Sequence, residues 1–401
     1  MSPLGAIALA ALAALQDGSE TRPVEGSFDR AVDAAVARGV SWLRAQQKAD
    51  GSFGTCDSSA GDRYVTGPTA IAVLALLASN VSKFDPAIER ARAHLRETRG
   101  RFVYELGLEL MAYDALAAPD RERLELERMT PAERRSYRFP RELEEVDRRR
   151  VEETAALLAS YQVQGLWDYG PREDRGDTSN TQFALLGLAA AARCGARIDP
   201  EVWWDSLQYF LVHQQSGGEL HRYREIVGTT LGGEPRTRTV VAETRGWGYW
   251  HGEREPERVR GSTTCIGIAS LRLCQEELAK PGIGVWRARA DAKGSKIREA
   301  IRDALAWLDA NFAVDRNPNQ GDYLYTYLYS LERVGALTER GHLGLHDWYR
   351  EGAEFLIRVQ KEPGCWEGTG YSPEIPNTSF ALLFLRRSTL PPVHTAGSSG
   401  R

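Results

Sequence analysis

Four segments of the sequence repeat one apolar pattern behind a threonine. Each carries a small residue three positions after the threonine and a leucine seven positions after it, and they begin at Thr69, Thr181, Thr264 and Thr378. Apolar residues also fall two and four positions after the threonine, so such a helix is apolar on most of its faces. Each segment is therefore predicted to be a helix that is buried on nearly all sides.

A second pattern precedes each of these helices. A glutamine follows an apolar or aromatic residue by five positions, and a turn of glycine, any residue and an aromatic residue comes next. A glutamine amide can bridge the end of its own helix to a neighbour's backbone, and an aromatic ring on the turn can cover that amide. We interpret these residues as scaffold: Trp42, Gln47, Phe53, Gln162, Trp167, Gln214, Trp250, Gln360 and Trp366.

The repeating unit is thus a helix, a glycine turn, a polar loop and a buried helix. With weaker copies near residues 102 and 326, six helix pairs fit the 401-residue chain. One pair cannot bury its own apolar faces, so neighbouring pairs must stack. We predict an all-α fold, an (α/α)6 toroid of inner and outer helices. The balance of 51 Lys and Arg against 55 Asp and Glu argues against a nucleic-acid partner.

The first residues have the pattern of a signal peptide. Residues 4–15 form an apolar, alanine-rich run, which is too short for the roughly 20 residues that cross a membrane. No lysine or arginine precedes this run. We predict that residues 1–16 are a signal peptide and that the protein is exported to the periplasm or secreted, with a cytoplasmic protein as the alternative. No transmembrane segment is predicted.

The spacing of the repeat defines the remaining boundaries. Gln214 and the next threonine are 50 residues apart, against 18 to 22 in the other units, which indicates an insertion at about 216–245. Residues 120–153 hold 11 acids and 10 bases and are predicted to be an exposed helical arm. The toroid is expected to span 30–388, between a linker at 17–29 and a disordered tail at 389–401.

The glutamine followed by glycine-x-tryptophan resembles the QW repeat of squalene and hopene cyclases. Residues 38–54 are the best copy, and the similarity runs from about residue 30 to residue 388. The unit as a whole looks like the αα-toroid of the terpenoid cyclase and protein prenyltransferase superfamily. This resemblance implies an isoprenoid-type or other apolar small molecule in a central cavity. It does not fix the activity, since one fold hosts several functions.

Cyclases of this family protonate their substrate with an acid in a DxDD-T motif at the start of an inner helix. The matching run here begins at Asp177, but Ser179 replaces the family's proton donor and Asn180 the last carboxylate. The aligned residue in the last repeat is Glu374. The resemblance therefore makes Asp177 and Glu374 the candidate catalytic residues if their loops converge, with helix capping as the alternative role of Asp177.

The zinc site of the prenyltransferases is also incomplete. The family's histidine lies in a D-x-x-H-T-x-Y run, and Tyr325 takes its place between Asp322 and Tyr327. We predict no metal and no cofactor. Four aromatic residues are predicted to line the ligand cavity, with core packing as the alternative: Tyr323, Tyr325, Tyr327 and Trp250.

Three functions remain open at this stage. The first is a cyclase-like or prenyltransferase-like protein that binds an isoprenoid, whether or not it is an enzyme. The second is a non-catalytic scaffold that binds a protein partner through the charged arm. The third is a carbohydrate-active (α/α)6 enzyme, for which Asp177, Glu243 and Glu374 supply carboxylates.

Overall fold

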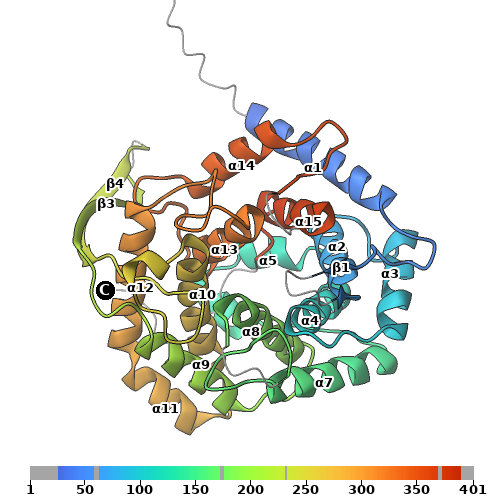
Figure 1. Ribbon diagram of the computed structural model, residues 1–401, viewed down its shortest axis with the longest axis horizontal. Coiled ribbons are helices and arrows are strands. Elements are labelled where there is room, and N and C mark those ends of the chain that lie inside the picture. The colour runs from blue at the N-terminus through green and yellow to red at the C-terminus, as the bar shows by residue number, and fades with distance from the viewer. Residues whose placement is uncertain (1–25, 58–62, 172–175, 231–232, 369–372, 390–401) are drawn as a thin grey trace, which may run out of the picture.

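The helices form two concentric rings (Figure 1). The structure is a computed structural model that describes residues 26–57, 63–171, 176–230, 233–368 and 373–389. The predicted signal peptide lies outside the described residues, as do residues 17–25 of the predicted linker and 390–401 of the predicted tail. The first helix begins at Ser27, so the end of the predicted linker belongs to the ring.

Six helices make up the inner ring. Each packs against its two neighbours, and the last packs against the first, so the ring is closed. The all-α toroid predicted from the repeat is confirmed. The inner helices are, in ring order, α2 (Gly67–Ala78), α4 (Val103–Ala117), α8 (Thr178–Arg193), α10 (Gly261–Leu278), α13 (Leu324–Leu337) and α15 (Glu374–Leu385).

Six further helices surround them as the outer ring. The short α11 (Gly284–Ala292) packs beside α9 and α12 of this layer, and a 3-10 turn, η1 (Pro256–Arg258), precedes α10. The outer helices are α1 (Ser27–Ala45), α3 (Pro86–Glu97), α7 (Glu145–Ser160), α9 (Pro200–Val212), α12 (Gly294–Ala310) and α14 (Trp348–Val359).

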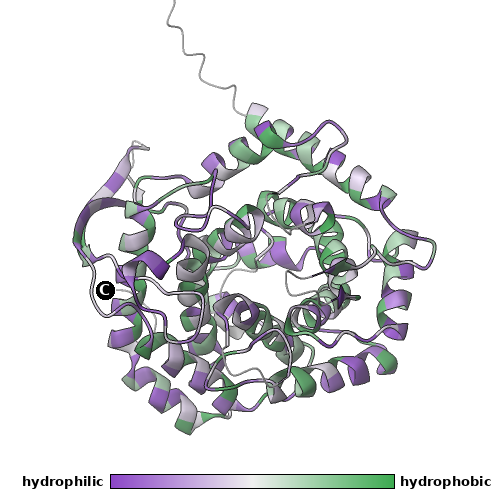
Figure 2. Ribbon diagram, in the orientation of Figure 1, coloured by the Kyte–Doolittle hydropathy of each residue, from purple (hydrophilic) through white to green (hydrophobic). Residues whose placement is uncertain are grey.

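The two rings differ in how much of each helix is buried. Every residue of α2 from Gly67 to Leu76 is buried, which matches its apolar character on all faces. In contrast, α1 buries a single stripe and faces solvent elsewhere. Figure 2 shows the same difference around the molecule, with hydrophobic inner helices and mixed outer ones. None of the described helices is long and apolar enough to cross a membrane.

Glutamine amides join consecutive outer helices. The side-chain nitrogen of Gln47, at the end of α1, donates to the carbonyl oxygen of Ala87 in α3 at 2.8 Å. Gln162 and Gln214 make the same bond to α9 and α12 at 2.9 and 2.8 Å. Gln360 donates to Ala35 of α1 at 2.9 Å, which links the last outer helix to the first.

Three glycine turns dock against the same neighbouring helices. Gly51, Gly165 and Gly364 have φ angles of +83°, +84° and +102°. A Cβ atom on any of them would lie 2.3 to 2.5 Å from a carbonyl oxygen of the next outer helix. Only glycine meets both conditions, because it tolerates positive φ and carries no side chain.

The fourth turn is not where the sequence places it. Trp250 is 37% exposed, whereas Trp247 is 1% exposed and its indole N–H donates to the carbonyl of Phe210 at 2.9 Å. The carbonyl of Arg245, two residues before Trp247, accepts from Gln214 at 3.0 Å, as the turn glycines do in two other units. Trp247 is therefore the scaffold tryptophan of this unit.

Arg245 explains the misassignment. It stands where the other units have glycine, and its guanidinium pairs with Asp303 of α12. The ion pair docks the turn on the next outer helix without a glycine. Gly267 of α10 makes room for the ring, since a Cβ there would lie 2.2 Å from an indole carbon of Trp247.

The insertion of the fourth unit contains an antiparallel hairpin. Strands β3 (Leu220–Thr229) and β4 (Pro235–Glu243) pair with each other and pack on the outer helix α12. A second, very short pair is formed by β1 (Cys56–Asp57) and β2 (Arg63–Tyr64) in the loop before α2. The β3–β4 hairpin lies at the periphery of the molecule (Figure 1), and the inner ring consists of helices.

Candidate functional site

A cavity of about 1180 Å³ lies at the end of the ring where the inner helices finish. All six inner helices contribute side chains from their C-terminal halves. The volume slightly exceeds the roughly 300–1,000 Å³ that is usual for small-molecule sites. Its wall combines charged side chains, most of them from the covering segment and the helix ends, with apolar side chains from the inner helices: Leu74, Leu77, Met111, Leu186, Leu273, Leu337 and Leu383.

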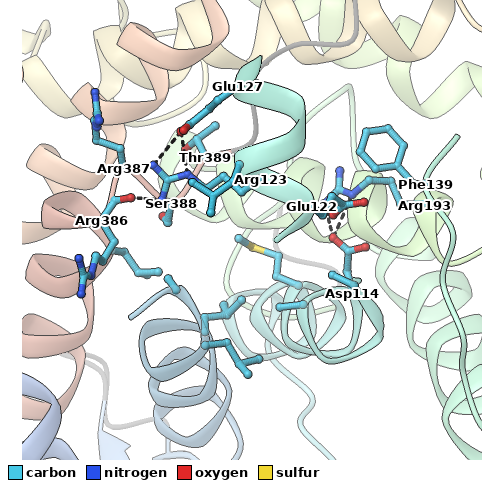
Figure 3. A pocket seen from close by; sticks show the side chains of 18 of the residues that line it. Asp114, Glu122, Arg123, Glu127, Phe139, Arg193, Arg386, Arg387, Ser388 and Thr389 are labelled. Atoms are coloured by element: carbon cyan, nitrogen blue, oxygen red, sulfur yellow. Dashed lines mark hydrogen bonds and ion pairs between the residues drawn. The ribbon is translucent and has the colours of Figure 1, made fainter. Parts of the chain in front are cut away.

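Residues 118–144, which connect α4 to α7, cover this cavity. This covering segment contains α5 (Glu122–Arg128) and α6 (Pro131–Ser136), and α5 is seen across the ring opening in Figure 1. Figure 3 shows Arg123 of α5 between Glu127 and the backbone oxygen of Arg386, at the end of α15. The covering segment therefore contacts the end of α15.

A buried ion-pair network fixes the covering segment to the ring. The Arg141 guanidinium lies 2.5 Å from a carboxylate oxygen of Asp114 in α4 and 2.7 Å from one of Glu122. Arg193 of α8 binds the other oxygen of Asp114 at 2.6 Å. The side chains of Arg141 and Glu122 are only 2% and 4% exposed. The prediction of an exposed, solvated arm is therefore wrong for this part of 120–153, because its charges neutralise one another in the interior.

Three charged residues of the cavity wall have a buried atom without a hydrogen-bond partner. These atoms are Oε1 of Glu276, Nε of Arg333 and Nε of Arg386. Among the described residues, Arg150 is the only other carboxylate or guanidinium side chain in this condition. Buried polar atoms are nearly always paired, so their concentration at one cavity indicates a site that binds something.

The cavity holds one carboxyl group with unusual acidity. Burial raises the pKa of Glu276 to about 7, although nearby Arg272 and Lys280 oppose the shift. The other buried acids of the wall are paired, Asp114 and Glu122 with guanidinium groups and Glu277 with Lys280. Within the described part of the chain, no three His, Cys, Asp or Glu residues are grouped so as to hold a metal ion.

Asp177 lies at the opposite end of the ring, at the start of α8. It caps the helix, accepting hydrogen bonds from the backbone and side-chain amides of Asn180 and from the hydroxyl of Ser179, each at 2.7 Å. Its complete burial raises the pKa to about 6. The Tyr249 hydroxyl lies 3.2 Å from Ser179 and 2.7 Å from the hydroxyl of Tyr169, which extends a polar chain.

Glu374 does not share the environment of Asp177. It is exposed at the start of α15, which lies across the ring from α8. Phe183 and Phe380 from these two helices meet with ring centroids 6.2 Å apart, and Tyr329 of α13 packs on Phe380 at 5.0 Å. Aromatic side chains thus fill the axis of the ring at this level. The catalytic roles of Asp177 and Glu374 stay predictions.

The four aromatic residues predicted to line a cavity do not line this one. Tyr323 and Trp250 are 43% and 37% exposed, whereas Tyr325 and Tyr327 are buried and donate their hydroxyl protons to backbone carbonyls. Tyr329, which follows Tyr325 by one turn of α13, does line the cavity. The alternation of tyrosines spreads them over several faces of α13, so only one reaches the cavity.

Sequence reasoning missed Arg333 and Glu276. A signal was present, because each interrupts an inner helix that is otherwise predicted to be buried on most faces. A charged residue in such a helix has either an internal partner or a ligand. The sequence alone cannot tell an internal partner from a ligand, since the possible partners come from helices far apart in the sequence.

Comparisons with known proteins found similar chains among solved structures alone. No family model and no curated protein matches the chain. Among solved structures, the type II terpene cyclase MstE from Scytonema in complex with geranylgeranyl dihydroxybenzoate is similar over 90% of this chain and 97% of that one, with 12% identity and a TM-score of 0.49. MstE in complex with merosterolic acid A is similar over 89% and 97%, with 14% identity and a TM-score of 0.44. The likeness concerns the fold alone.

Proposed function

We propose that this toroid binds an apolar small molecule of isoprenoid type in the cavity beneath the covering segment. The observation that carries the proposal is the cavity itself, with apolar side chains from all six inner helices and a covering segment over one end of the ring. Burial of hydrocarbon contributes about 25 cal/mol per Å² of apolar surface, so such a wall favours a hydrocarbon ligand. The repeat's resemblance to squalene and hopene cyclases supports an isoprenoid.

The composition of the wall does not favour a sugar. Carbohydrate sites use tryptophan platforms and a pair of free carboxylates. No tryptophan is among the described residues that line the cavity. Asp114, Glu122 and Glu277 are paired with cations, so Glu276 is a single unpartnered carboxylate and not one of a pair. A purely structural scaffold has no need of an open cavity of this size.

Binding of geranylgeraniol to the full chain tests this proposal. Titration followed by native mass spectrometry and calorimetry should give a 1:1 complex with micromolar or tighter affinity. Ala115→Trp places a large ring in the cavity and should weaken binding at least tenfold. Ala156→Trp, at an exposed position of α7, is the matched control and should bind as the wild type does.

Two outcomes would contradict the proposal. One is the absence of a complex with geranylgeraniol and with squalene. The other is a complex whose affinity Ala115→Trp leaves unchanged while the protein remains folded, because the ligand would then lie elsewhere.

A further inference from the structure

Arg333 is a buried cation that faces the cavity. It lies in the second half of α13, is 3% exposed and belongs to the cavity wall. Its Nε–H has no hydrogen-bond partner. A guanidinium in an apolar environment is costly unless an anion is close to it.

The structure gives Arg333 hydrogen bonds but no ion pair. Its Nη2 donates to the Tyr329 hydroxyl and its Nη1 to the Tyr329 carbonyl oxygen at 3.3 Å, and the guanidinium carbon lies 3.5 Å from the centre of the tyrosine ring. In the part of the chain that the structure describes, no carboxylate lies within ion-pair distance of it. The nearest described negative charge is that of buried Glu332, which precedes Arg333 in sequence and interacts with it electrostatically. The two oxygens of Glu332 accept hydrogen bonds from the backbone and hydroxyl of Thr389, so they leave the Nε–H of Arg333 without an acceptor.

The other cations of the cavity wall have a carboxylate partner or are exposed, although Arg386 also keeps an unpartnered Nε. Six have carboxylate partners: Lys83, Arg123, Arg141, Arg193, Lys280 and Arg386. Three are exposed to solvent: Arg121, Arg138 and Arg387. Among these cavity cations, Arg333 alone combines burial with the lack of a described carboxylate partner.

Tyr329 supplies a second donor at the same place. Its hydroxyl oxygen accepts from Arg333, so its own O–H proton is available to another acceptor. Burial raises the pKa of this hydroxyl, which keeps it protonated and a donor at neutral pH. Arg333 and Tyr329 both line the cavity, so a single ligand group can accept from both.

We infer that the cavity ligand carries an anionic group, a carboxylate or a phosphate ester, that binds to Arg333 and Tyr329. The inference rests on the proposed function, because it assigns a head group to the apolar ligand of the same cavity. The apolar wall would hold the hydrocarbon, and the guanidinium would hold the charge. A charged hydrogen bond in such surroundings is among the stronger polar contacts in proteins.

Three probes with the same hydrocarbon chain test the inference at pH 8. These are geranylgeraniol, its phosphate monoester and the corresponding carboxylic acid, each titrated into the full chain by calorimetry. The wild type should bind both anions at least tenfold more tightly than the alcohol. Inorganic phosphate and acetate alone should bind far more weakly than the lipid anions.

Substitutions locate the effect. Arg333→Gln should lose most of the preference for anions while keeping the alcohol affinity within about twofold, and Arg333→Lys should retain part of the preference. Tyr329→Phe keeps the ring and should lower the preference a few-fold. Arg316→Gln, at an exposed site that does not line the cavity, should behave as the wild type does.

The outcomes separate this inference from the proposed function. Equal affinity of the wild type for the three lipid probes would overturn the inference and leave the apolar cavity intact. Failure of all three to bind would instead remove the proposed function. Tight binding of inorganic phosphate without a chain, or an unchanged preference in folded Arg333→Gln, would also overturn the inference. If Arg333→Gln does not fold, the wild-type comparison and Tyr329→Phe still decide.

Discussion

The two ends of the ring use buried charge in opposite ways. At the end where the inner helices begin, the buried carboxylate of Asp177 accepts three hydrogen bonds from its own helix start. At the end where they finish, Glu276 and Arg333 each keep a buried atom without a partner. Both ends are built from the same repeat, so the difference lies in what covers them.

Helix direction accounts for part of this contrast. At the start of α8 the side chain of Asp177 accepts a hydrogen bond from a free backbone N–H group, whereas the N-cap side chains of the other described inner helices make no such bond. The helix ends have no equivalent side chains in the repeat, and the covering segment closes over them instead. At the first end the buried carboxylate of Asp177 is therefore satisfied within its own helix start, whereas the second end contains the cavity and the unpartnered groups.

The largest expected effect tests the structural role of the first end. Trp247→Ala should lower the free energy of unfolding by about 3–5 kcal/mol, because it empties a fully buried site and removes a hydrogen bond. Trp250→Ala should cost less than about 1 kcal/mol, since that ring is partly exposed. Urea unfolding of both variants measures the difference. If both variants lost the same free energy of unfolding, the assignment of Trp247 as the scaffold tryptophan in place of Trp250 would be wrong.

The next effect concerns the covering segment. Arg141→Met should cost about 3 kcal/mol, because it leaves Glu122 unpaired in the interior and Asp114 with one guanidinium instead of two. It should also expose residues 118–144 to limited proteolysis. Arg128→Met, at an exposed position of α5, should change the unfolding free energy by about 0.5 kcal/mol or less. Resistance of Arg141→Met to both assays would mean that the network does not hold the cover.

The sequence predicted the ring better than the site. The threonine and glutamine patterns are local, and local spacing is sufficient to place six pairs of helices. Trp247 was missed because the repeated turn is recognised by its glycine, and in this unit Arg245, which pairs with Asp303, stands in the place of that glycine. The turn still docks on the next outer helix, but through an ion pair and not through a close glycine contact. A search for a repeated glycine cannot detect such a replacement.

The candidate cavity could not be predicted for a different reason. Its wall combines α13, α10 and a covering segment that is some 200 residues away from α13 in the chain. The acids and bases of 120–153 were predicted to be a solvated surface because the network that buries some of them includes residues outside that segment. Arg141 pairs with Asp114, which in turn pairs with Arg193. Resemblance to a family directed attention to Asp177, whereas the unpartnered groups lie at the other end.

A smaller effect follows from the acidity of Glu276. Its pKa rises from 4.5 in the unfolded chain to about 7 in the folded protein, so between these values the folded state binds more protons. The free energy of unfolding should therefore fall as the pH rises from 4.5 to 7, by at most about 3 kcal/mol. Glu276→Gln should remove the decline between pH 6 and 7, as measured by urea unfolding. Exposed Glu354→Gln is the control and should retain it.

The smallest expected effect is that of Asp177→Asn, and it separates the two ends most clearly. Burial raises the pKa of Asp177 from 3.8 to about 6, so this residue contributes a decline in stability only as the pH rises through that lower window. Asparagine keeps the acceptor for the Asn180 backbone amide, and the variant should change the unfolding free energy by about 1 kcal/mol. Its affinity for geranylgeraniol should stay within twofold of the wild type. If the wild type converts an isoprenoid to a cyclic product and Asp177→Asn stops the conversion without weakening binding, then the first end is catalytic and our assignment of the two ends is wrong.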